Sequence, residues 1–444
     1  MSIDPIVINA PPSKSVSHRA LICAALAKGE SELHNVLQSV DTTITSRVVT
    51  AAGAKVEDRG GVLFVNGFTD GPKGADKDGA PVAAFMSESG TSCRLLTGVL
   101  AAGTGRFRIS GAARMHERPI GDLTQALAHQ GVTFEWEINP GFPPFIMEST
   151  GLKGGGVDIS LKESSQYLSG LLLAAPLAKT PMTISVVGDK AVSWPYVALT
   201  LNAMEDFKID FDVAVKSDKG WEVVPWRSLK GITPGKARFI VRPSQYQSSR
   251  YKVEADWSNG SYFLAAGAVG KRPVHATGLR SDSLQGDRAI LRILQTMGAK
   301  IESDFDGVTV YPSQLHGANV DMSDCPDLVP TVAVAAAFAD SPTTIRNVAH
   351  LRIKECDRLA AMVREVGRTG AHTEDLDDGL RITPRPIQGD RDIRFNTYGD
   401  HRIAMSTSIF GLAGITVVHD DANCVSKSFP TFFDEWAKVR EGNQ

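Results

Sequence analysis

The stretch VPTVAVAAAFA at residues 329–339 is the plainest of six Ala- and Leu-rich segments that recur along this chain of 444 residues. Such runs predict buried helices, because small and apolar side chains allow close packing on every face. A turn containing Gly or Pro and a β-branched strand follow each segment, and most strands precede a second, more amphipathic helix and a short strand. The six expected inner helices are His18–Ala27, Ser92–Ala102, Gln166–Ala178, Ser261–Val269, Val329–Ala339 and Arg402–Ala413.

Recurrence of one unit indicates that each copy buries its apolar face against its neighbours. The unit has the pattern βαβαββ, and six copies predict an α/β protein of two domains with three repeats each. We expect the Ala-rich helices on the inside of each domain, as in an inside-out α/β barrel. The expected domains are residues 12–250 and residues 251–444, the second completed by residues 1–11. The spacing between repeats is largest at 228–252, where we expect the main hinge.

A single large doubly wound sheet is the alternative explanation of these periodicities. It would be supported by a Gly-x-Gly-x-x-Gly fingerprint after the first strand, and the sequence contains none. The chain also lacks Gly-x-x-x-x-Gly-Lys-Ser/Thr, so nucleotide phosphates have no standard binding loop. Two domains also suit the length, because single hydrophobic cores stop growing at roughly 250–300 residues.

Composition narrows the class of function. Forty-seven Lys and Arg against fifty Asp and Glu give a net charge of −3, which argues against nucleic acid or an anionic membrane as partner. The five cysteines are scattered and form no Cys-x-x-Cys pair, so we expect reduced thiols and no metal site. Apolar runs such as 171–177 are too short to span a bilayer. The β-like run at 6–8 does not resemble a secretory signal, and we expect a cytoplasmic monomer.

The starts of the expected inner helices are rich in hydroxyl groups and cations. A helix N-terminus presents unpaired N–H groups and a positive dipole end, which suits anions. A single Ser or Thr there would be only an N-cap. Lys14, Arg19 and Arg94, however, lie where the dipole favours acids, which suggests that bound ligands supply the negative charge. Further cationic strings occur at 114–119, 352–358 and 424–428, although the second alone could be a solvated helix face with i,i+3 ion pairs.

Six of these strings together resemble the EPSP synthase family of enolpyruvyl transferases. They occur in the order of that family, and the resemblance covers the chain from residue 11 to residue 433. The strings are Ser-Lys-Ser-x-Ser-x-Arg at 13–19, Gly-Thr-x-x-Arg at 90–94, Arg-Met-x-Glu-Arg-Pro-Ile at 114–120, Ser-Ser-Gln at 164–166, Lys-Glu-x-Asp-Arg at 354–358 and Asp-His-Arg-x-Ala-Met at 400–405.

The resemblance implies an enzyme that joins phosphoenolpyruvate to the 5-hydroxyl of 3-phosphoshikimate and releases phosphate, on the shikimate route to chorismate and aromatic amino acids. It implies addition followed by elimination, with no metal and no cofactor. Each substrate carries at least two negative charges, so an almost neutral protein must gather its cations at one site. The small-molecule substrates are the expected partners.

The resemblance also assigns ligands to both substrates. The residues implied to bind 3-phosphoshikimate are Lys14, Ser15, Arg19, Ser164, Ser165, Gln166, Ser193, Tyr196, Asp327, His350 and Lys354. The residues implied to bind phosphoenolpyruvate are Lys14, Gly90, Arg118, Gln166, Glu355, Arg358, His401, Arg402 and Lys427. These types suit the task, because hydroxyls donate to phosphate, a guanidinium matches a carboxylate, and a glycine allows close backbone approach.

Acid–base chemistry requires one proton on the methylene carbon and the removal of one from the attacking hydroxyl. By the same resemblance, Glu355 protonates the methylene, and Asp327 handles the hydroxyl together with Lys354. Lys14 is a further candidate for proton transfer. Which group acts in which step stays open at this point.

Four positions depart from the family pattern without removing a charged group. Pro12 stands where Gly is common, Glu88 where Asn is usual, Leu95 where Pro is frequent, and His350 where Asn is common. These departures affect the contacts expected of the helix near residue 92 and of the 4-hydroxyl of shikimate.

Two alternatives of function remain. A related transferase acts on UDP-N-acetylglucosamine and carries a reactive Cys on a mobile loop, whereas the stretch 111–121 contains none and Cys93 lies on an expected inner helix. A non-enzymatic repeat scaffold would have no need of paired acids among clustered cations.

Overall fold

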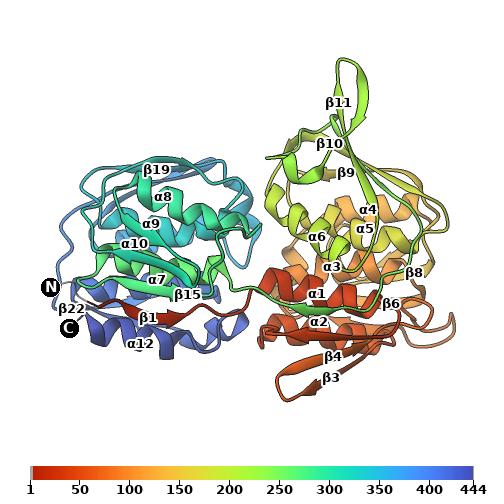
Figure 1. Cartoon of the computed structure of the whole chain (residues 1–444), viewed down its shortest axis with the longest axis horizontal. Helices are drawn as coiled ribbons and strands as arrows, with labels where there is room; N and C mark the ends of the chain where they lie inside the picture. Colours follow the sequence, from red (N-terminus) through yellow and green to blue (C-terminus); the bar gives the residue numbers. More distant parts are fainter. Residues whose placement is uncertain (1–3, 444) are drawn as a thin grey trace. The chain divides into compact units, whose positions relative to one another are not determined.

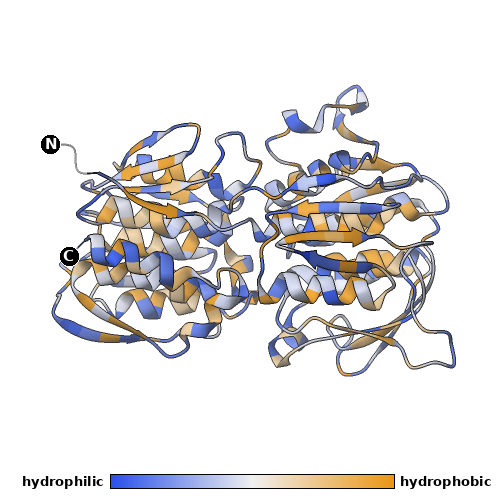
Figure 2. Ribbon diagram, turned by 60° about the horizontal axis from the view of Figure 1, so that its bottom comes forward, coloured by the Kyte–Doolittle hydropathy of each residue, from blue (hydrophilic) through white to orange (hydrophobic). Residues whose placement is uncertain are grey.

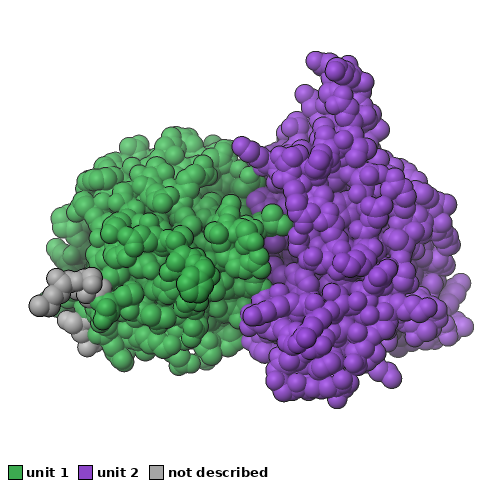
Figure 3. Space-filling model, viewed as in Figure 1, with its two compact units in different colours: residues 1–13, 254–444 green, residues 14–253 purple. Residues whose placement is uncertain are grey.

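The computed structural model describes residues 4–443. The chain forms two compact units (Figure 3). Unit 2 is continuous, Lys14–Val253, and unit 1 combines the N-terminal segment up to Ser13 with the chain from Glu254 onward. The polypeptide therefore passes between the units twice, at 13/14 and at 253/254. The limits expected from the sequence were 11/12 and 250/251.

Unit 2 contains three sheets and six α-helices (Figure 1). The first sheet has the order β14 (Arg250–Lys252), β2 (Glu30–His34), β4 (Val62–Asn66) and β3 (Lys55–Arg59). The second has the order β5 (Val82–Phe85), β6 (Thr104–Ser110), β8 (Phe145–Thr150) and β7 (Thr133–Trp136). The third has the order β12 (Gly220–Val223), β11 (Phe211–Ser217), β13 (Ala237–Val241), β10 (Met182–Ala191) and β9 (Gly155–Leu161). The helices are α1 (Lys14–Leu26), α2 (Val40–Ala51), α3 (Gly90–Ala101), α4 (Gly121–His129), α5 (Gln166–Ala174) and α6 (Trp194–Asp206), with 3₁₀ helices η1 (Ala113–Glu117), η2 (Ala175–Leu177) and η3 (Trp226–Ser228).

Unit 1 is built in the same way. Its first sheet has the order β1 (Ile6–Asn9), β15 (Val274–Thr277), β17 (Gly307–Tyr311) and β16 (Lys300–Ser303). The second has the order β18 (Asn319–Asp321), β19 (Thr343–Arg346), β21 (Gly379–Thr383) and β20 (His372–Leu376), and the third pairs β22 (Arg391–Phe395) with β23 (Ile415–His419). The helices are α7 (Trp257–Val269), α8 (Ile290–Thr296), α9 (Val329–Ala337), α10 (Arg358–Gly367), α11 (His401–Ser408) and α12 (Phe432–Gly442). The 3₁₀ helices are η4 (Gly286–Ala289), η5 (Pro326–Leu328), η6 (Ala349–Ile353), η7 (Ile409–Ala413) and η8 (Ala422–Lys427).

The Ala-rich segments form the interior of each unit. Every residue of α9 is buried, and α1 is buried from Val16 to Leu26. Helices α3 and α5 cross at a pair of glycines, where a Cβ on Gly98 would lie 2.5 Å from the backbone oxygen of Gly170. Hydrophobic residues accordingly follow the inner helices and the strands (Figure 2). Close packing of these helices therefore depends on small residues at the crossing points.

Each sheet contains one parallel pair whose two strands belong to different repeats or lie on either side of an inner helix. In unit 1, β1 runs parallel to β15 with Ile6 opposite Val274, so the N-terminal segment adds a strand to that unit. In unit 2, β14 runs parallel to β2 with Arg250 opposite Glu32.

Three expectations from the sequence were wrong. The stretch 228–252 is no hinge, because β13 lies inside the third sheet of unit 2, paired with both β10 and β11. The six repeats are not uniform, since the third sheet of unit 2 has a fifth strand, β12, whose hairpin with β11 projects from the unit (Figure 1), while the last sheet has two strands. The helices expected at 166–178 and 402–413 stop at Ala174 and Ser408 and continue as the 3₁₀ helices η2 and η7.

No helix within residues 4–443 has the length and apolar character needed to cross a membrane.

Candidate active site

Lys14 and Arg19 lie on the first turns of α1. The ammonium of Lys14 pairs with Asp41 of α2 at 3.3 Å, and this carboxylate is almost fully buried. Arg19 is 1% exposed and donates to Thr200 Oγ1 and to the backbone oxygens of Ser15 and Tyr196 at 2.8–2.9 Å. Burial lowers the pKa of Arg19 to about 10, which leaves it charged at neutral pH. The structure therefore joins Ser15, Arg19 and Tyr196 across α1 and α6.

Gly90 and Arg118 meet at the start of α3. A Cβ on Gly90 would lie 2.6 Å from the Cζ of Arg118, so any larger residue would displace the guanidinium. Arg118 is 5% exposed, and its Nη1 donates to the backbone oxygen of Glu88 at 3.1 Å. Arg118 can therefore occupy this position only because residue 90 is a glycine.

Gln166, the first residue of α5, is held by two residues of α3. Arg94 donates to its Oε1 at 3.3 Å, and its Nε2 donates to Thr91 Oγ1 at 3.1 Å. Arg94 and Thr91 belong to the Gly-Thr-x-x-Arg string but were not among the expected ligands. Their position beside Gln166 brings the second and third helix starts together.

Three buried serines stand before α5 and α6. Ser165 and Ser193 occupy the N-cap positions, yet neither side chain caps its own helix. Ser164 Oγ accepts a hydrogen bond from the backbone N–H of Gln166 at 3.2 Å. Ser193 adopts a left-handed backbone with φ of 57°, which is uncommon for a residue with a Cβ. Ser165 and Ser193 therefore differ from Ser89, whose side chain does cap α3.

In unit 1, Arg358 lies at the centre of a buried charge cluster. The guanidinium, 1% exposed, donates to Asp400 at 2.8 Å, to Asp327 at 3.1 Å and to Glu355 at 3.0 Å. Burial alone would lower its pKa, but the three carboxylates raise it. The string 352–358 is therefore not a solvated helix face, although its predicted ion pair between Glu355 and Arg358 does form. Asp357 instead pairs with Arg352 at 3.1 Å and caps α10.

Arg402 and Lys427 complete this cluster. Arg402 Nη2 donates to Asp327 Oδ2 at 2.8 Å, and Lys427 Nζ lies 3.4 Å from Glu355 Oε1. Asp327 and Glu355, the two expected acid–base groups, thus each bridge two cations. The backbone at Arg402 is fixed by Asp400, whose Oδ1 caps α11 by accepting from its N–H at 2.9 Å.

The remaining expected residues of unit 1 are His401, His350 and Lys354. His401 is the buried first residue of α11, with Nδ1 3.9 Å from Asp400 Oδ1. His350 is buried on η6, and Lys354 follows that helix immediately before Glu355. Sequence reasoning missed Asp41 and Asp400 as partners of the cations. The only signals in the sequence were their positions. Asp41 lies two residues after an N-cap serine, and Asp400 directly precedes His401.

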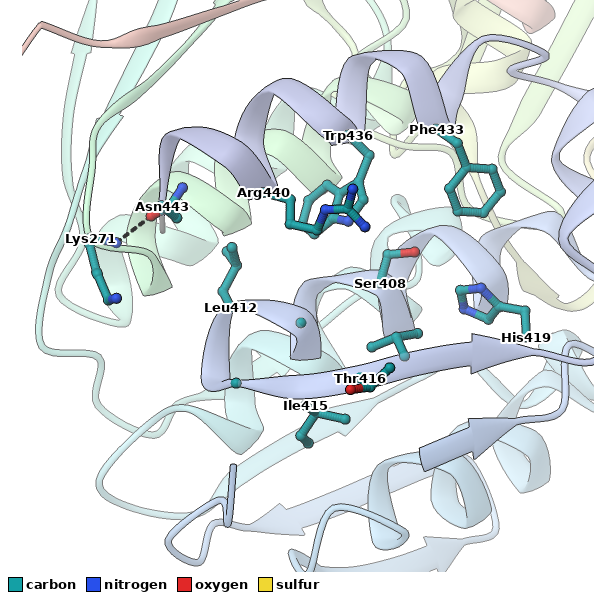
Figure 4. A pocket seen from close by; sticks show the side chains of 13 residues that line it. Lys271, Ser408, Leu412, Ile415, Thr416, His419, Phe433, Trp436, Arg440 and Asn443 are labelled. Carbon is teal, nitrogen blue, oxygen red and sulfur yellow. Dashed lines mark hydrogen bonds between the residues drawn. The ribbon is translucent and has the colours of Figure 1, made fainter. Parts of the chain in front are cut away.

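A separate pocket of about 530 Å³ lies at the C-terminal end of α11, whereas Arg402 lies at its N-terminal end (Figure 4). Residues of α12 and β23 line it, including Trp436, Arg440 and Thr416, together with Lys271. The residues that line this pocket differ from those expected to bind substrate.

Comparison with known proteins points to one family. The family profile described as EPSP synthase (3-phosphoshikimate 1-carboxyvinyltransferase) matches residues 5–234 and 230–436. A 3-phosphoshikimate 1-carboxyvinyltransferase of Shewanella amazonensis is 40% identical over 98% of this chain and 96% of its own, and one of a Sulfurovum species is 38% identical over 96% and 95%.

Solved structures share the fold. The EPSP synthase of Acinetobacter baumannii superposes with a TM-score of 0.75 at 24% identity, covering 98% of this chain and 95% of its own. The enolpyruvyl transferase NikO of Streptomyces tendae superposes with a TM-score of 0.71 at 17% identity, covering 98% and 94%. The chain therefore belongs to the EPSP synthase family, that of the 3-phosphoshikimate 1-carboxyvinyltransferases.

Proposed function

We propose that the polar helix starts of unit 2 and the charge cluster of unit 1 together bind the two substrates of this family's reaction. The chain transfers the enolpyruvyl group of phosphoenolpyruvate to 3-phosphoshikimate with release of phosphate. The helix starts of unit 2 supply Ser15, Arg19, Ser164, Ser165, Gln166, Ser193 and Tyr196 to 3-phosphoshikimate, with Asp327, His350 and Lys354 from unit 1. Lys14, Gly90, Gln166 and Arg118 of unit 2 and Glu355, Arg358, His401, Arg402 and Lys427 of unit 1 bind phosphoenolpyruvate.

The observation that carries this proposal is the cluster of Asp327 and Glu355 among three buried cations. Arg358, Arg402 and Lys427 are each at most 7% exposed, and each contacts one or both of these carboxylates. A buried cation cluster of this size suits a phosphate and a carboxylate on one small molecule. The carboxylates occupy positions from which they can exchange protons with that molecule.

The assignment of the proton transfers follows the family resemblance. Asp327 with Lys354 takes the proton of the 5-hydroxyl, whose oxygen bonds to C2 of phosphoenolpyruvate. As that bond forms, the electron pair of the C2–C3 double bond takes a proton from Glu355 at C3, which gives a tetrahedral adduct. One proton of C3 then returns to the Glu355 carboxylate, the C2–O bond to phosphate breaks, and the double bond is regenerated. Phosphate leaves with the proton that Asp327 had taken. A bound phosphate beside Glu355 favours the protonated carboxyl, because like charges close together disfavour ionisation.

The finer organisation belongs to the same proposal. The buried inner helices and the sheets around them support an inside-out α/β barrel in each unit. We expect a cytoplasmic monomer whose partners are its two substrates, without a membrane or nucleic-acid partner and without a cofactor.

The test is phosphate release from phosphoenolpyruvate with three additions. We expect release with 3-phosphoshikimate, and none with UDP-N-acetylglucosamine or without acceptor. Release with the UDP-sugar would move the chain to the related transferase activity, and no release with either acceptor would favour a binding scaffold.

A further inference from the structure

The segment Ser283–Asp287 of unit 1 is fixed tightly by one buried side chain, that of Gln285. Its Oε1 accepts from Ser13 Oγ at 3.2 Å and from the backbone N–H of Trp257 at 3.1 Å. Its Nε2 donates to Glu254 Oε1 at 2.9 Å and to the backbone oxygen of Ala255 at 2.8 Å. Gln285 thereby connects Ser13 and Glu254, which lie where the chain crosses between the units, to the start of α7. The backbone two residues later is consequently held in place as well.

Asp287 projects from this segment into the interior. Asp287 is 5% exposed. One of its carboxyl oxygens is hydrogen-bonded to Ser258, and the other, Oδ1, has no hydrogen-bond partner among residues 4–443. Ser258 Oγ in turn accepts from Arg402 Nη1. Because a hydroxyl has a single hydrogen, Ser258 can accept from Arg402 while it donates to Asp287. The carboxyl therefore reaches Arg402 through one hydroxyl.

We infer that Asp287 is a positioning residue for the transfer reaction, which orients the guanidinium of Arg402 through Ser258. Asp327 fixes the other terminal nitrogen, Nη2, at 2.8 Å, so the two acids hold Arg402 from both nitrogens. A planar guanidinium held at two points presents its remaining donors in one direction. Since Asp327 also has to take part in proton transfer, the constant support comes from Asp287. This inference rests on the proposed role of Arg402 as a ligand of phosphoenolpyruvate.

The charge of Asp287 bears on that role. Burial chiefly, and next the neighbouring Asp327, raise its pKa to about 8, although Arg402 opposes the shift. Asp256 also faces it and raises its pKa, and Cys325 lies close enough for its own pKa to be raised by Asp287. At neutral pH the carboxyl is therefore largely protonated, which leaves the positive charge of Arg402 available for a substrate anion. Ionisation at higher pH would place a second negative charge beside that anion.

Steady-state kinetics of five variants test this inference. Asp287→Ala removes the support of Ser258, and we expect the KM for phosphoenolpyruvate to rise about tenfold, as for a lost hydrogen bond to a charged group, with little change for 3-phosphoshikimate. Ser258→Ala should have a similar effect, and the double variant should be no worse than the single ones, because both remove the same connection. Asp287→Asn should recover at least fivefold of the loss. Asp282→Asn is the matched control, because Asp282 is an exposed acid in the same loop. Its KM values should equal those of the wild type.

The pH profile separates positioning from a merely structural role. Between pH 7 and pH 9 we expect the wild-type KM for phosphoenolpyruvate to rise as Asp287 ionises, and the Asp287→Asn enzyme to lack that rise. Equal KM values for Asp287→Ala and the wild type, additive effects of Asp287→Ala and Ser258→Ala, or identical pH profiles would each overturn the inference. Failure of the proposed function would instead show as no phosphate release by the wild-type enzyme, so the two results are distinguishable.

Discussion

At the scale of single residues, the proposed site owes its form to carboxylates that each serve two cations. Glu355 bridges Arg358 and Lys427, and Asp327 bridges Arg358 and Arg402; the three cations are buried in unit 1, whereas both acids are partly exposed. An unpaired buried charge would cost several kcal/mol, so these acids stabilise the cations that the substrate later needs. The same acids thereby stand where protons have to move.

Replacing Glu355 by Gln preserves the shape of this site and removes the transferable proton. We expect turnover to fall by about 10²–10⁴, as for other lost acid–base groups, while the substrate KM values change little. Rapid-quench measurement of phosphate release is the suitable assay. The partly exposed Glu374→Gln, outside the charge cluster, serves as the control, and turnover of Glu355→Gln close to that of the wild type would exclude Glu355 as the proton donor.

His18, buried on α1, makes the stability of the protein depend on pH. Burial lowers its pKa from 6.5 to about 3, so the native state keeps the ring neutral while the unfolded chain takes up a proton below about pH 6.5. The unfolded state then binds more protons, and stability falls as the pH falls from about 6.5 towards 3. The loss from this group between pH 7 and pH 4.5 is on the order of 2 kcal/mol.

Urea unfolding at both pH values measures this effect. His18→Gln, which can keep a hydrogen bond to Thr45, should lose less stability on acidification than the wild type, whatever its absolute stability. The exposed His372→Gln should behave as the wild type. An equal pH dependence in all three proteins would contradict the assignment to His18.

At the scale of elements, the polar helix starts do two kinds of work. Some are ordinary caps, such as Ser39 for α2 and Asp400 for α11. Two others, Ser165 at α5 and Ser193 at α6, do not cap their helices through their side chains. Because a helix start already carries a positive dipole end, hydroxyls that do not cap it are suited to anions.

The start of α3 allows a sharp test of one such position. Gly90→Ala would push a methyl group into the guanidinium of Arg118, so we expect the KM for phosphoenolpyruvate to rise about tenfold or more while that for 3-phosphoshikimate stays within about twofold. Calorimetric titration with each substrate is the direct measurement. Gly156→Ala is the matched control, because a Cβ there meets no atom within 4 Å. Equal weakening of both substrates by Gly90→Ala would contradict the division of ligands.

At the scale of the whole molecule, the proposed ligands of each substrate are divided between the two compact units. Arg19, Arg118 and Ser164 belong to unit 2, and Asp327, Arg358 and Arg402 belong to unit 1. A ligand shifts a conformational equilibrium only by its differential affinity for the two states. Contacts from both units to one substrate would therefore favour a compact conformation.

We expect 3-phosphoshikimate alone to reduce the radius of gyration in small-angle scattering. The passages at 13/14 and 253/254 are the flexible points in this prediction, in place of the stretch 228–252. Shikimate without the phosphate is the control and should have a weaker effect at equal concentration. An unchanged radius at saturating 3-phosphoshikimate would contradict ligand-driven closure.

The sequence by itself determined the local features: the alternation of helices and strands, the buried Ala-rich segments and the cationic strings with their family resemblance. These depend on residues near one another in the chain, since periodicity and N-terminal chemistry act within a few turns. The strand β13 shows the limit, because its place inside a sheet depends on pairing with β10 and β11 rather than on its own Pro- and Gly-rich surroundings.

Apart from the i,i+3 pair of Glu355 with Arg358, only the tertiary structure decided which acid of the cluster meets which cation. Arg402 reaches Asp327 across 75 residues and Arg358 reaches Asp400 across 42, and no spacing rule connects such pairs. Asp287 is the extreme case, since one acidic residue after a Gly resembles any turn until folding buries it against Ser258. Its environment, and hence its charge, arises from packing of α7, η5 and α11 around it, because desolvation and neighbouring charges are properties of the folded interior alone.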